Sequence, residues 1–174
     1  MASDSANRGE DLDKSRGDEK VNIVVAMKQI PDLHQIRMRD RQPVLDDVPL
    51  TLGSIDKNAL EAAVNLRDTH GGKVIALAAG SEELEDTIKE ALAAGADEAF
   101  MIFDDSLDDA DSSVIAVVLA AAIEKMDDVD IILFGEGSGD NYSGQVGSRA
   151  AGILGLPQAG YVSSIEVQGN SAIA

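Results

Sequence analysis

The sequence contains no cysteine and no tryptophan, and it has only three phenylalanines, two tyrosines and two histidines. The absence of cysteine excludes a disulfide framework, a thiolate-bound iron–sulfur cluster, a zinc ribbon and a thiol nucleophile. The sequence indicates neither a Cys/His nor a Ser/His/Asp catalytic arrangement, so an enzyme with its own acid–base residues is disfavoured. The core must be aliphatic, because Val, Ile, Leu and Ala abound.

Basic residues are scarce. The 14 Lys and Arg stand against 32 Asp and Glu, which gives a formal net charge of -18. Such a surface repels phosphate backbones, so we expect no nucleic acid partner. Acidity spread over a whole chain is typical of proteins that stay soluble in a salty cytoplasm, and we therefore expect a halophilic host.

Long hydrophobic runs are also missing. The longest apolar run, residues 114–123, is too short to span a bilayer, and residues 1–20 carry neither a signal peptide nor a membrane anchor. We therefore predict a soluble, cytoplasmic protein that is not inserted in a membrane. Its 174 residues suit one domain, which we place at residues 21–174, after an acidic disordered tail at residues 1–20.

Strand and helix patterns alternate along the domain. Ser54 and Ser81 are the expected N-caps of the first two helices, with Glu82 and Glu83 in the first turn of the second. Residues 27–53 hold three of the four prolines and are predicted to be a long structureless connection. The expected strands are residues 21–26, 73–79, 99–103, 130–134 and 161–167; the expected helices run from 54 to the glycines at 71 and 72, from 81 to 95, from 112 to 126, and up to Leu154 with Gly155 after it.

This alternation implies right-handed crossovers and a parallel, doubly wound α/β sheet. Ligands of such sheets bind outside the carboxyl ends of the strands, where we expect residues 27–53, 79–81 and 135–147 to converge. The third loop, GEGSGDNYSGQVG, lies between a strand and a helix, where backbone N–H groups receive phosphate well. A tight corner without a ligand would explain the glycines equally well. The first interpretation of this pattern is nevertheless that the chain binds a nucleotide.

The familiar nucleotide fingerprints are absent. No GxGxxG follows the first strand, so a dinucleotide site has little support. Residues 139–145 have the spacing of a P-loop, but Gln145 stands where a lysine must reach the phosphates, which argues against triphosphate hydrolysis. The loop instead offers Asp140, Asn141, Ser143 and Gln145, whose polar side chains can hold ribose or phosphate.

Four segments resemble one known family. They are VAMKQIPD (25–32), SIDKNALEAA (54–63), ALAAGADEAF (91–100) and GDNYSGQVGSRAAGILGLPQAGYV (139–162). In order and spacing they are similar to the N-terminal domain of the β subunit of electron transfer flavoprotein, the FixA-like family. The resemblance covers nearly everything after the acidic tail.

The resemblance implies a fold, a role and a site. The fold is a Rossmann-like adenine-nucleotide-binding domain, related to that of universal stress proteins. The role is that of a subunit without catalytic residues that pairs with an α subunit, which holds FAD. The pair carries electrons from flavin dehydrogenases to a membrane quinone reductase or another acceptor. Its own pocket would hold AMP or a second FAD, and no metal. The implied cofactor-binding residues are Ala26, Met27, Lys28, Asp56, Ala79, Gly80, Gly135, Asp140, Ser143, Gly144, Gln145, Val146 and Gly147.

The sequence departs from the family pattern in places. Glu136 and Gly137 stand where members commonly carry a basic residue and Gln, and the resemblance ends at Ala174, before the loop recognised by dehydrogenases and the arm that clasps the α subunit. We therefore expect the C-terminal part of the family's domain to be missing. The alternative is a stand-alone nucleotide-binding module of the universal-stress-protein kind. The phosphate loop of that family repeats glycines at a fixed spacing. Gly144 and Gly147 begin such a spacing here, but Pro157 interrupts it. A nucleotide-using enzyme would need the lysine and acid–base residues that this chain lacks.

Overall fold

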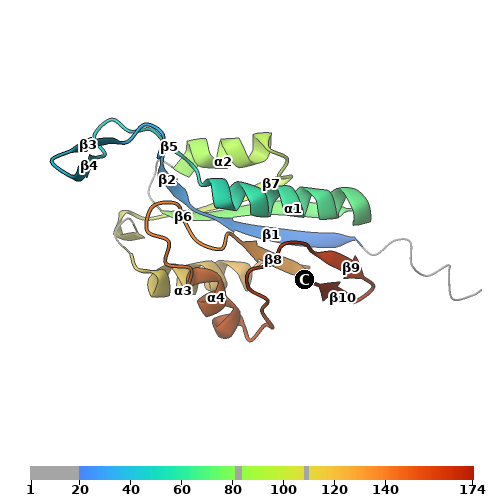
Figure 1. Cartoon of the computed structure of the whole chain (residues 1–174). Helices are drawn as coiled ribbons and strands as arrows, with labels where there is room; N and C mark the ends of the chain where they lie inside the picture. Colours follow the sequence, from blue (N-terminus) through green and yellow to red (C-terminus); the bar gives the residue numbers. More distant parts are fainter. Residues whose placement is uncertain (1–19, 81–83, 108–109) are drawn as a thin grey trace, which may run out of the picture.

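The chain forms three layers, with one parallel sheet between two pairs of helices (Figure 1). This computed structural model describes residues 20–80, 84–107 and 110–174. The sheet has four strands in the order β7-β6-β1-β8. The strand bounds are β1 Val21–Met27, β6 Gly72–Gly80, β7 Glu98–Phe103 and β8 Ile131–Phe134.

The chain runs outward from β1 to β6 and β7, and then crosses back to place β8 on the other side of β1. The strand order therefore reverses next to β1. Ile23 of β1 lies opposite both Val74 of β6 and Ile131 of β8, which sets the register of the sheet centre. In an α/β sheet such a reversal opens a crevice at the carboxyl ends of the strands.

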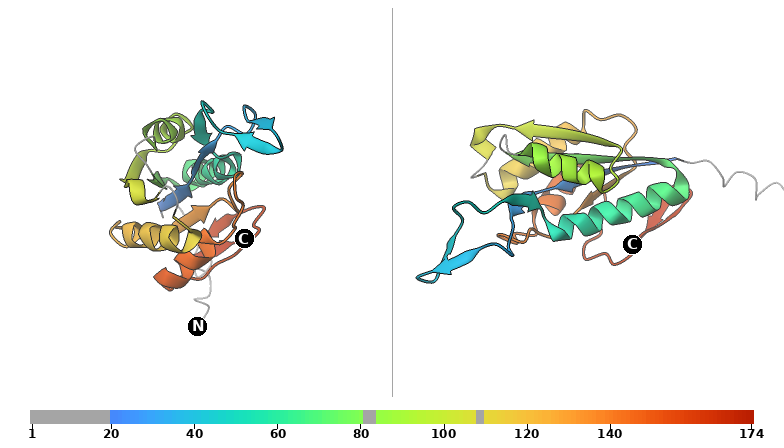
Figure 2. Two further views of the ribbon diagram at one scale, coloured as in Figure 1. Left: turned by 90° about the vertical axis from the view of Figure 1, so that its left-hand side faces the viewer. Right: turned by 90° about the horizontal axis from the view of Figure 1, so that it is seen from above.

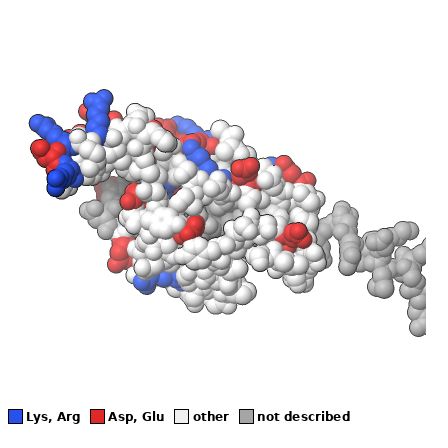
Figure 3. Space-filling view, viewed as in Figure 1, with Lys and Arg blue, Asp and Glu red and all other residues white. Residues whose placement is uncertain are grey.

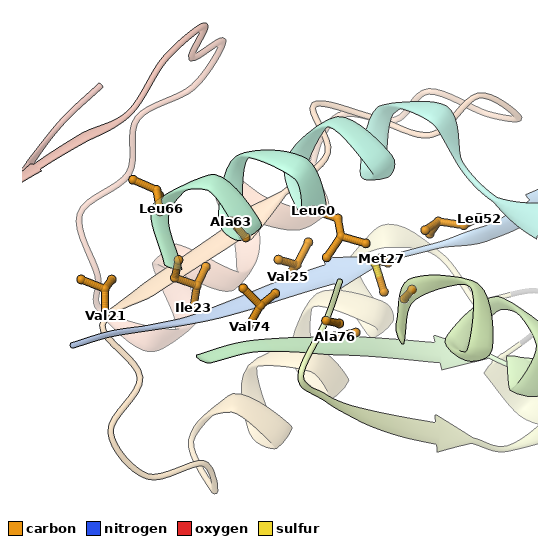
Figure 4. Close-up of a cluster of buried hydrophobic side chains, with 12 residues drawn as sticks. Val21, Ile23, Val25, Met27, Leu52, Leu60, Ala63, Leu66, Val74 and Ala76 are labelled. Atoms are coloured by element: carbon orange, nitrogen blue, oxygen red, sulfur yellow. The ribbon is translucent and has the colours of Figure 1, made fainter. Parts of the chain in front are cut away.

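Helices cover both faces of the sheet, as the doubly wound pattern predicts (Figures 1 and 2). One face carries α1 (Ser54–His70) and α2 (Leu84–Ala93), and the other carries α3 (Ser112–Ile123) and α4 (Val146–Leu154). On the first face Leu60 and Ala63 of α1 pack over Ile23 and Val25 (Figure 4). The second face buries Val24, Ala26, Ile75, Leu77, Leu119 and Ile123.

The helix ends agree only in part with the prediction. Gly155 ends α4 in the left-handed conformation, as expected. Asp111, which is not among the predicted caps, caps α3 by accepting hydrogen bonds from the N–H groups of Ser113 and Val114. The predicted cap at Ser54 is wrong, because Gly53 holds the N-cap position and Ser54 is the first helical residue. The third helix ends at Ile123, three residues before the expected end, where the chain turns.

The prediction that residues 27–53 lack structure is wrong. Two short strands, β2 (Gln29–Pro31) and β5 (Leu50–Leu52), pair antiparallel and form a stalk. Between them β3 (Arg37–Arg39) and β4 (Gln42–Val44) form a hairpin, which projects from one end of the molecule (Figure 1). Its turn residues, Asp40 and Arg41, both have positive φ, at 49° and 66°. Such a turn suits the twist of a hairpin, but Asp-Arg is a weak sequence signal for it.

The expected fifth strand at residues 161–167 is also wrong. Tyr161 has a φ of 56°, which is incompatible with an extended strand, and residues 161–165 pair with no strand in the described part of the chain. Instead β9 (Glu166–Gln168) and β10 (Ser171–Ile173) form a separate antiparallel hairpin. Gly169 supplies the positive φ in its two-residue turn.

Some predictions fall on residues outside the described ranges. These are the cap at Ser81, the first-turn residues Glu82 and Glu83, and the tail up to residue 19. Within the described ranges, no helix combines the length and the apolar character that a membrane-spanning segment needs.

Candidate functional site

A cavity of about 700 Å³ opens at the carboxyl ends of β1, β6 and β8. Its volume lies in the range of about 300–1,000 Å³ that is typical of small-molecule sites. The structure brings every residue of the predicted site to this one cavity, including residues that lie far apart in the sequence. They are Ala26, Met27, Lys28, Asp56, Ala79, Gly80, Gly135, Asp140, Ser143, Gly144, Gln145, Val146 and Gly147.

Asp56 joins three of the segments that build the cavity. It lies in the first turn of α1 and is only 5 % exposed. Its Oδ2 atom accepts a hydrogen bond of 2.9 Å from the backbone N–H of Lys28, and the backbone N–H of Gly135 also donates to its carboxylate. The start of α1 is thereby tied to the ends of β1 and β8.

Burial raises the pKa of Asp56 to about 6, although the two backbone donors act in the opposite direction. The carboxylate also leaves little room beside it. A Cβ atom at Gly135 would lie 2.2 Å from Oδ1 of Asp56, which is far below any real contact. Gly135 is therefore required by the close approach of a carboxylate, a role that is separate from phosphate binding.

Lys28 and Asp140 form an ion pair of 2.5 Å between the loop after β1 and the glycine-rich loop. Burial is the largest influence on the pKa of Asp140 and raises it, but the hydrogen bonds from Lys28, Ser138 and the Asn141 backbone, with the charge of Lys28, together outweigh it, so the pKa lies below its ordinary value. Among the described residues that line the cavity, Lys28 is the one basic side chain. A phosphate that binds near Lys28 must compete with Asp140 for it.

The glycine-rich loop is braced by its own side chains. The Tyr142 hydroxyl donates a hydrogen bond of 2.5 Å to Glu136, and the Tyr142 ring lies against Gly137, where a Cβ would come within 3.1 Å. Ser138 donates to the side chain of Asn141 at 3.0 Å. Glu136, which departs from the family pattern, is therefore occupied within the loop.

The amino end of α4 faces the cavity. Gln145 is its N-cap residue, and no hydrogen bond from a described side chain caps the helix there. The Gln145 Oε1 atom accepts hydrogen bonds from Arg149 at 3.1 and 2.8 Å, so its amide N–H groups remain for a ligand. Gly147 lets α4 approach β8, because a Cβ would lie 3.2 Å from the Phe134 ring. The free N–H groups and the helix dipole favour an anion here.

The prediction missed the amino end of α3, which also lines the cavity through Asp111 and Ser112. This segment follows β7, so the rule that ligands bind at the carboxyl ends of strands could have found it. The loop contains no glycine, so it lacks the signal that singled out the loop after β8. The Asp111 carboxylate accepts hydrogen bonds from the backbone N–H groups of Ser113 and Val114 in its own helix. Because these bonds hold the side chain in the helix cap, Asp111 forms part of the cavity wall.

The groups that line the cavity are suited to binding a small ligand. The cavity offers backbone N–H groups, neutral amide and hydroxyl groups and one lysine, which can hold an anion and orient a ribose. Within the described ranges, no three His, Asp or Glu side chains gather in a way that could hold a metal ion.

Comparison with known proteins gives consistent matches. The profile of the electron transfer flavoprotein domain matches residues 44–174. The electron transfer flavoprotein subunit beta of Thermoanaerobacterium thermosaccharolyticum is 38% identical over 155 residues, covering 88% of this chain and 59% of that protein. Protein FixA of Azorhizobium caulinodans is 37% identical over 151 residues, covering 83% and 54%.

A third relative belongs to a larger assembly by name. The caffeyl-CoA reductase-Etf complex subunit CarD of Acetobacterium woodii is 35% identical over 156 residues, covering 88% of this chain and 60% of that protein. The chain therefore spans somewhat more than half the length of these relatives.

Proposed function

Because the chain belongs to the electron transfer flavoprotein family, we propose that it acts as the β subunit of an electron carrier, binding an adenine nucleotide and pairing with an α subunit. The names of its relatives support the role, since they describe a β subunit and a subunit of an Etf complex. The cavity at the carboxyl edge of the sheet supports the proposal that the chain binds a nucleotide.

The observation that carries the proposal is the convergence of three strand ends on one cavity. The amino end of α4 and the glycine-rich loop direct backbone N–H groups toward a phosphate, and Lys28 supplies one positive charge. The Gln145 amide donates to phosphate or ribose oxygens. The Asp56 carboxylate accepts a further hydrogen bond from a ribose hydroxyl, since a carboxylate has about four acceptor sites and the two backbone donors use two of them.

The ligand is AMP or the ADP portion of a second FAD. The cavity has one cation against four lining carboxylates, Asp56, Asp111, Glu136 and Asp140, which disfavours a highly charged polyphosphate. FAD, when bound, supplies the redox chemistry that the side chains of this chain lack. The residues of the cavity then hold the nucleotide and exclude water, and they take no covalent part.

The electron path runs through the partner. We place the electron-carrying FAD in the α subunit or between the subunits, flavin dehydrogenases as donors, and a membrane quinone reductase or another protein as acceptor. In this proposal the chain contributes one wall of the heterodimer and the residues that bind the nucleotide. We expect it to work in the cytoplasm.

The test is to purify the chain with the α subunit of the same organism, denature the complex and identify the released ligand. Because the electron-carrying FAD is released in either case, the amounts decide: one FAD and one AMP per heterodimer indicate AMP in this cavity, whereas two FAD and no AMP indicate a second FAD. In calorimetry with AMP, Gln145→Ala should weaken binding by roughly 1 to 3 kcal/mol, because a hydrogen bond to the bound nucleotide is lost.

The control for that substitution is Gln158→Ala, an exposed glutamine outside the cavity, which should leave the affinity unchanged. Absence of adenine-nucleotide binding by a properly folded heterodimer would contradict the proposal. Tight nucleotide binding by a chain that never pairs with the α subunit would instead favour a stand-alone module of the universal-stress kind.

A further inference from the structure

The β3–β4 hairpin stands away from the body of the protein (Figures 1 and 2). Its two strands contact mainly each other, and every residue of β3 is exposed. An isolated two-stranded hairpin is marginally stable in water, because it buries too little apolar surface. Its turn also places Arg41 in the left-handed region, which residues other than glycine, asparagine and aspartate rarely adopt.

The hairpin concentrates positive charge on an acidic protein. Arg37, Arg39 and Arg41 lie within five residues at its tip, and Figure 3 shows basic side chains gathered at this end of the molecule. None of the three lies within salt-bridge distance of a described carboxylate. By contrast, Lys28, Lys57, Arg67, Lys73 and Lys89 are all paired with carboxylates.

The type of cation is also informative. All the basic residues of the hairpin are arginines, whereas most described cations elsewhere in the chain are lysines. Arginine and methionine are enriched at protein interfaces and lysine is depleted there. Met38 lies between two of the arginines in β3, on the opposite face of the strand, and it is 67 % exposed, so the hairpin also presents an apolar side chain.

We propose that the β3–β4 hairpin is a docking arm that binds an acidic patch on the partner α subunit. This inference rests on the proposed function, since it takes the partner from there. The hairpin stands on the β2–β5 stalk, whose Gln29 and Leu50 also line the cavity. A subunit that closes over the cavity would therefore meet the hairpin at the same edge of the sheet.

A protein carboxylate patch fits the hairpin better than nucleic acid or an anionic membrane does. Both of those surfaces extend well beyond the hairpin and would meet the remaining surface of a chain with a net charge of -18, which repels them. A compact patch of Asp and Glu avoids that repulsion. Guanidinium groups bind carboxylates through two parallel hydrogen bonds, which also orients the partner.

The experiment measures binding of the chain to the α subunit as a function of salt. In the triple variant Arg37→Gln, Arg39→Gln, Arg41→Gln, we expect the Kd to rise at least about tenfold at 0.1 M salt and its salt dependence to become shallower. The melting temperature of the chain alone should stay unchanged, because the hairpin does not pack on the body.

The matched control removes three charges elsewhere, with Lys20→Gln, Lys89→Gln and Lys125→Gln, and it should leave the Kd within twofold of the wild type. All three lysines are exposed and lie outside the hairpin and the cavity. A triple Arg→Lys variant should bind between the wild type and the glutamine variant if the paired hydrogen bonds matter.

The outcomes separate this inference from the proposed function. A wild-type chain that does not pair with the α subunit would overturn both. Equal affinities of the arginine variant and the lysine control would overturn the docking arm alone. Binding of the wild type to duplex DNA or to phosphatidylglycerol vesicles that the arginine variant loses, with an unchanged Kd for the α subunit, would also overturn it.

Discussion

The glycine-rich loop and the β3–β4 hairpin lie at the same edge of the sheet, but they are held in different ways. The loop is tied to the body at several points, through Gly135 to Asp56 and through Asp140 to Lys28, and it is braced internally by Tyr142. The hairpin is held only by the stalk at its base, and its arginines have no partner among the described carboxylates. A surface arranged in advance suits a small ligand, whereas an arm with unused charge suits a large partner.

The largest expected effect comes from breaking the loop's attachment at Gly135. Gly135→Ala places a Cβ 2.2 Å from Oδ1 of Asp56, so the carboxylate must move and lose its backbone donors. We expect a loss of about 2 to 4 kcal/mol in the free energy of unfolding, from overpacking and a broken buried hydrogen bond, together with loss of nucleotide binding. Chemical denaturation and calorimetry measure the two effects.

The control is Gly152→Ala. Gly152 lies in α4, and a Cβ added there would meet no side chain and no other segment within 4 Å, so alanine should be neutral or stabilise the helix by up to about 1 kcal/mol. Equal stabilities of the two variants would show that the close approach at Gly135 is not a constraint.

The second effect concerns the ionisation of Asp56. The folded-state pKa of about 6 lies above the ordinary value of 3.8, so between these values the folded protein keeps a proton that the unfolded chain releases. The contribution of Asp56 to stability is therefore complete below about pH 4 and falls as the pH rises, by about 3 kcal/mol at pH 7.

Other carboxylates, such as Asp97 and Asp140, have lowered pKa values and act in the opposite direction. The measurement is therefore the difference in unfolding free energy between the wild type and Asp56→Asn, from pH 4 to pH 7. As the pH rises from 4 to 7, the unfolding free energy of the wild type should fall by about 3 kcal/mol relative to that of Asp56→Asn. A difference that stays constant over this range would mean that Asp56 titrates normally.

The third effect separates ligand contact from backbone strain. Gly144 has a φ of 61° at the end of the glycine-rich loop. Gly144→Val should lose the nucleotide while keeping the helical signal in circular dichroism, at a stability loss of about 1 to 2 kcal/mol. The matched variant is Gly169→Val, which has a φ of 55° in the β9–β10 hairpin, away from the cavity. If both variants bind AMP normally, the phosphate lies elsewhere.

The smallest effect is that of salt, and it should have opposite signs for the body and the arm. Raising the salt from 0.1 to 1 M shortens the Debye length from about 10 Å to about 3 Å and screens the repulsion within a chain of net charge -18. The melting temperature should therefore rise by a few degrees, while binding through the hairpin weakens. A flat or falling melting temperature would reject the expected adaptation to a salty cytoplasm.

The parts that could be predicted from the sequence share a physical reason. Buried parallel strands such as β1 appear as continuous β-branched runs, and their topology alone brings their carboxyl ends together. The cavity could thus be anticipated without any contact being known. Asp56 could be predicted only through the family resemblance, because a carboxylate in the first turn of a helix ordinarily serves only the helix dipole.

The two small hairpins could not be predicted in the same way. The β3–β4 turn at Asp40 and Arg41 depends on left-handed backbone conformations that the residue types do not announce. The β9–β10 hairpin had a better signal, Gly169 followed by Asn170, but the apolar residues before it suggested one longer strand. Short strands depend on their partners more than on their own sequence.

The double hydrogen bonding of Asp56 has a mechanical consequence. One carboxylate holds the ends of β1 and β8 at the start of α1, so these three segments share a single joint. Widening the cavity at any one of them strains the other two, because both backbone donors converge on the same group. Any change in the spacing of these three segments must therefore stretch or break at least one of the two hydrogen bonds to Asp56.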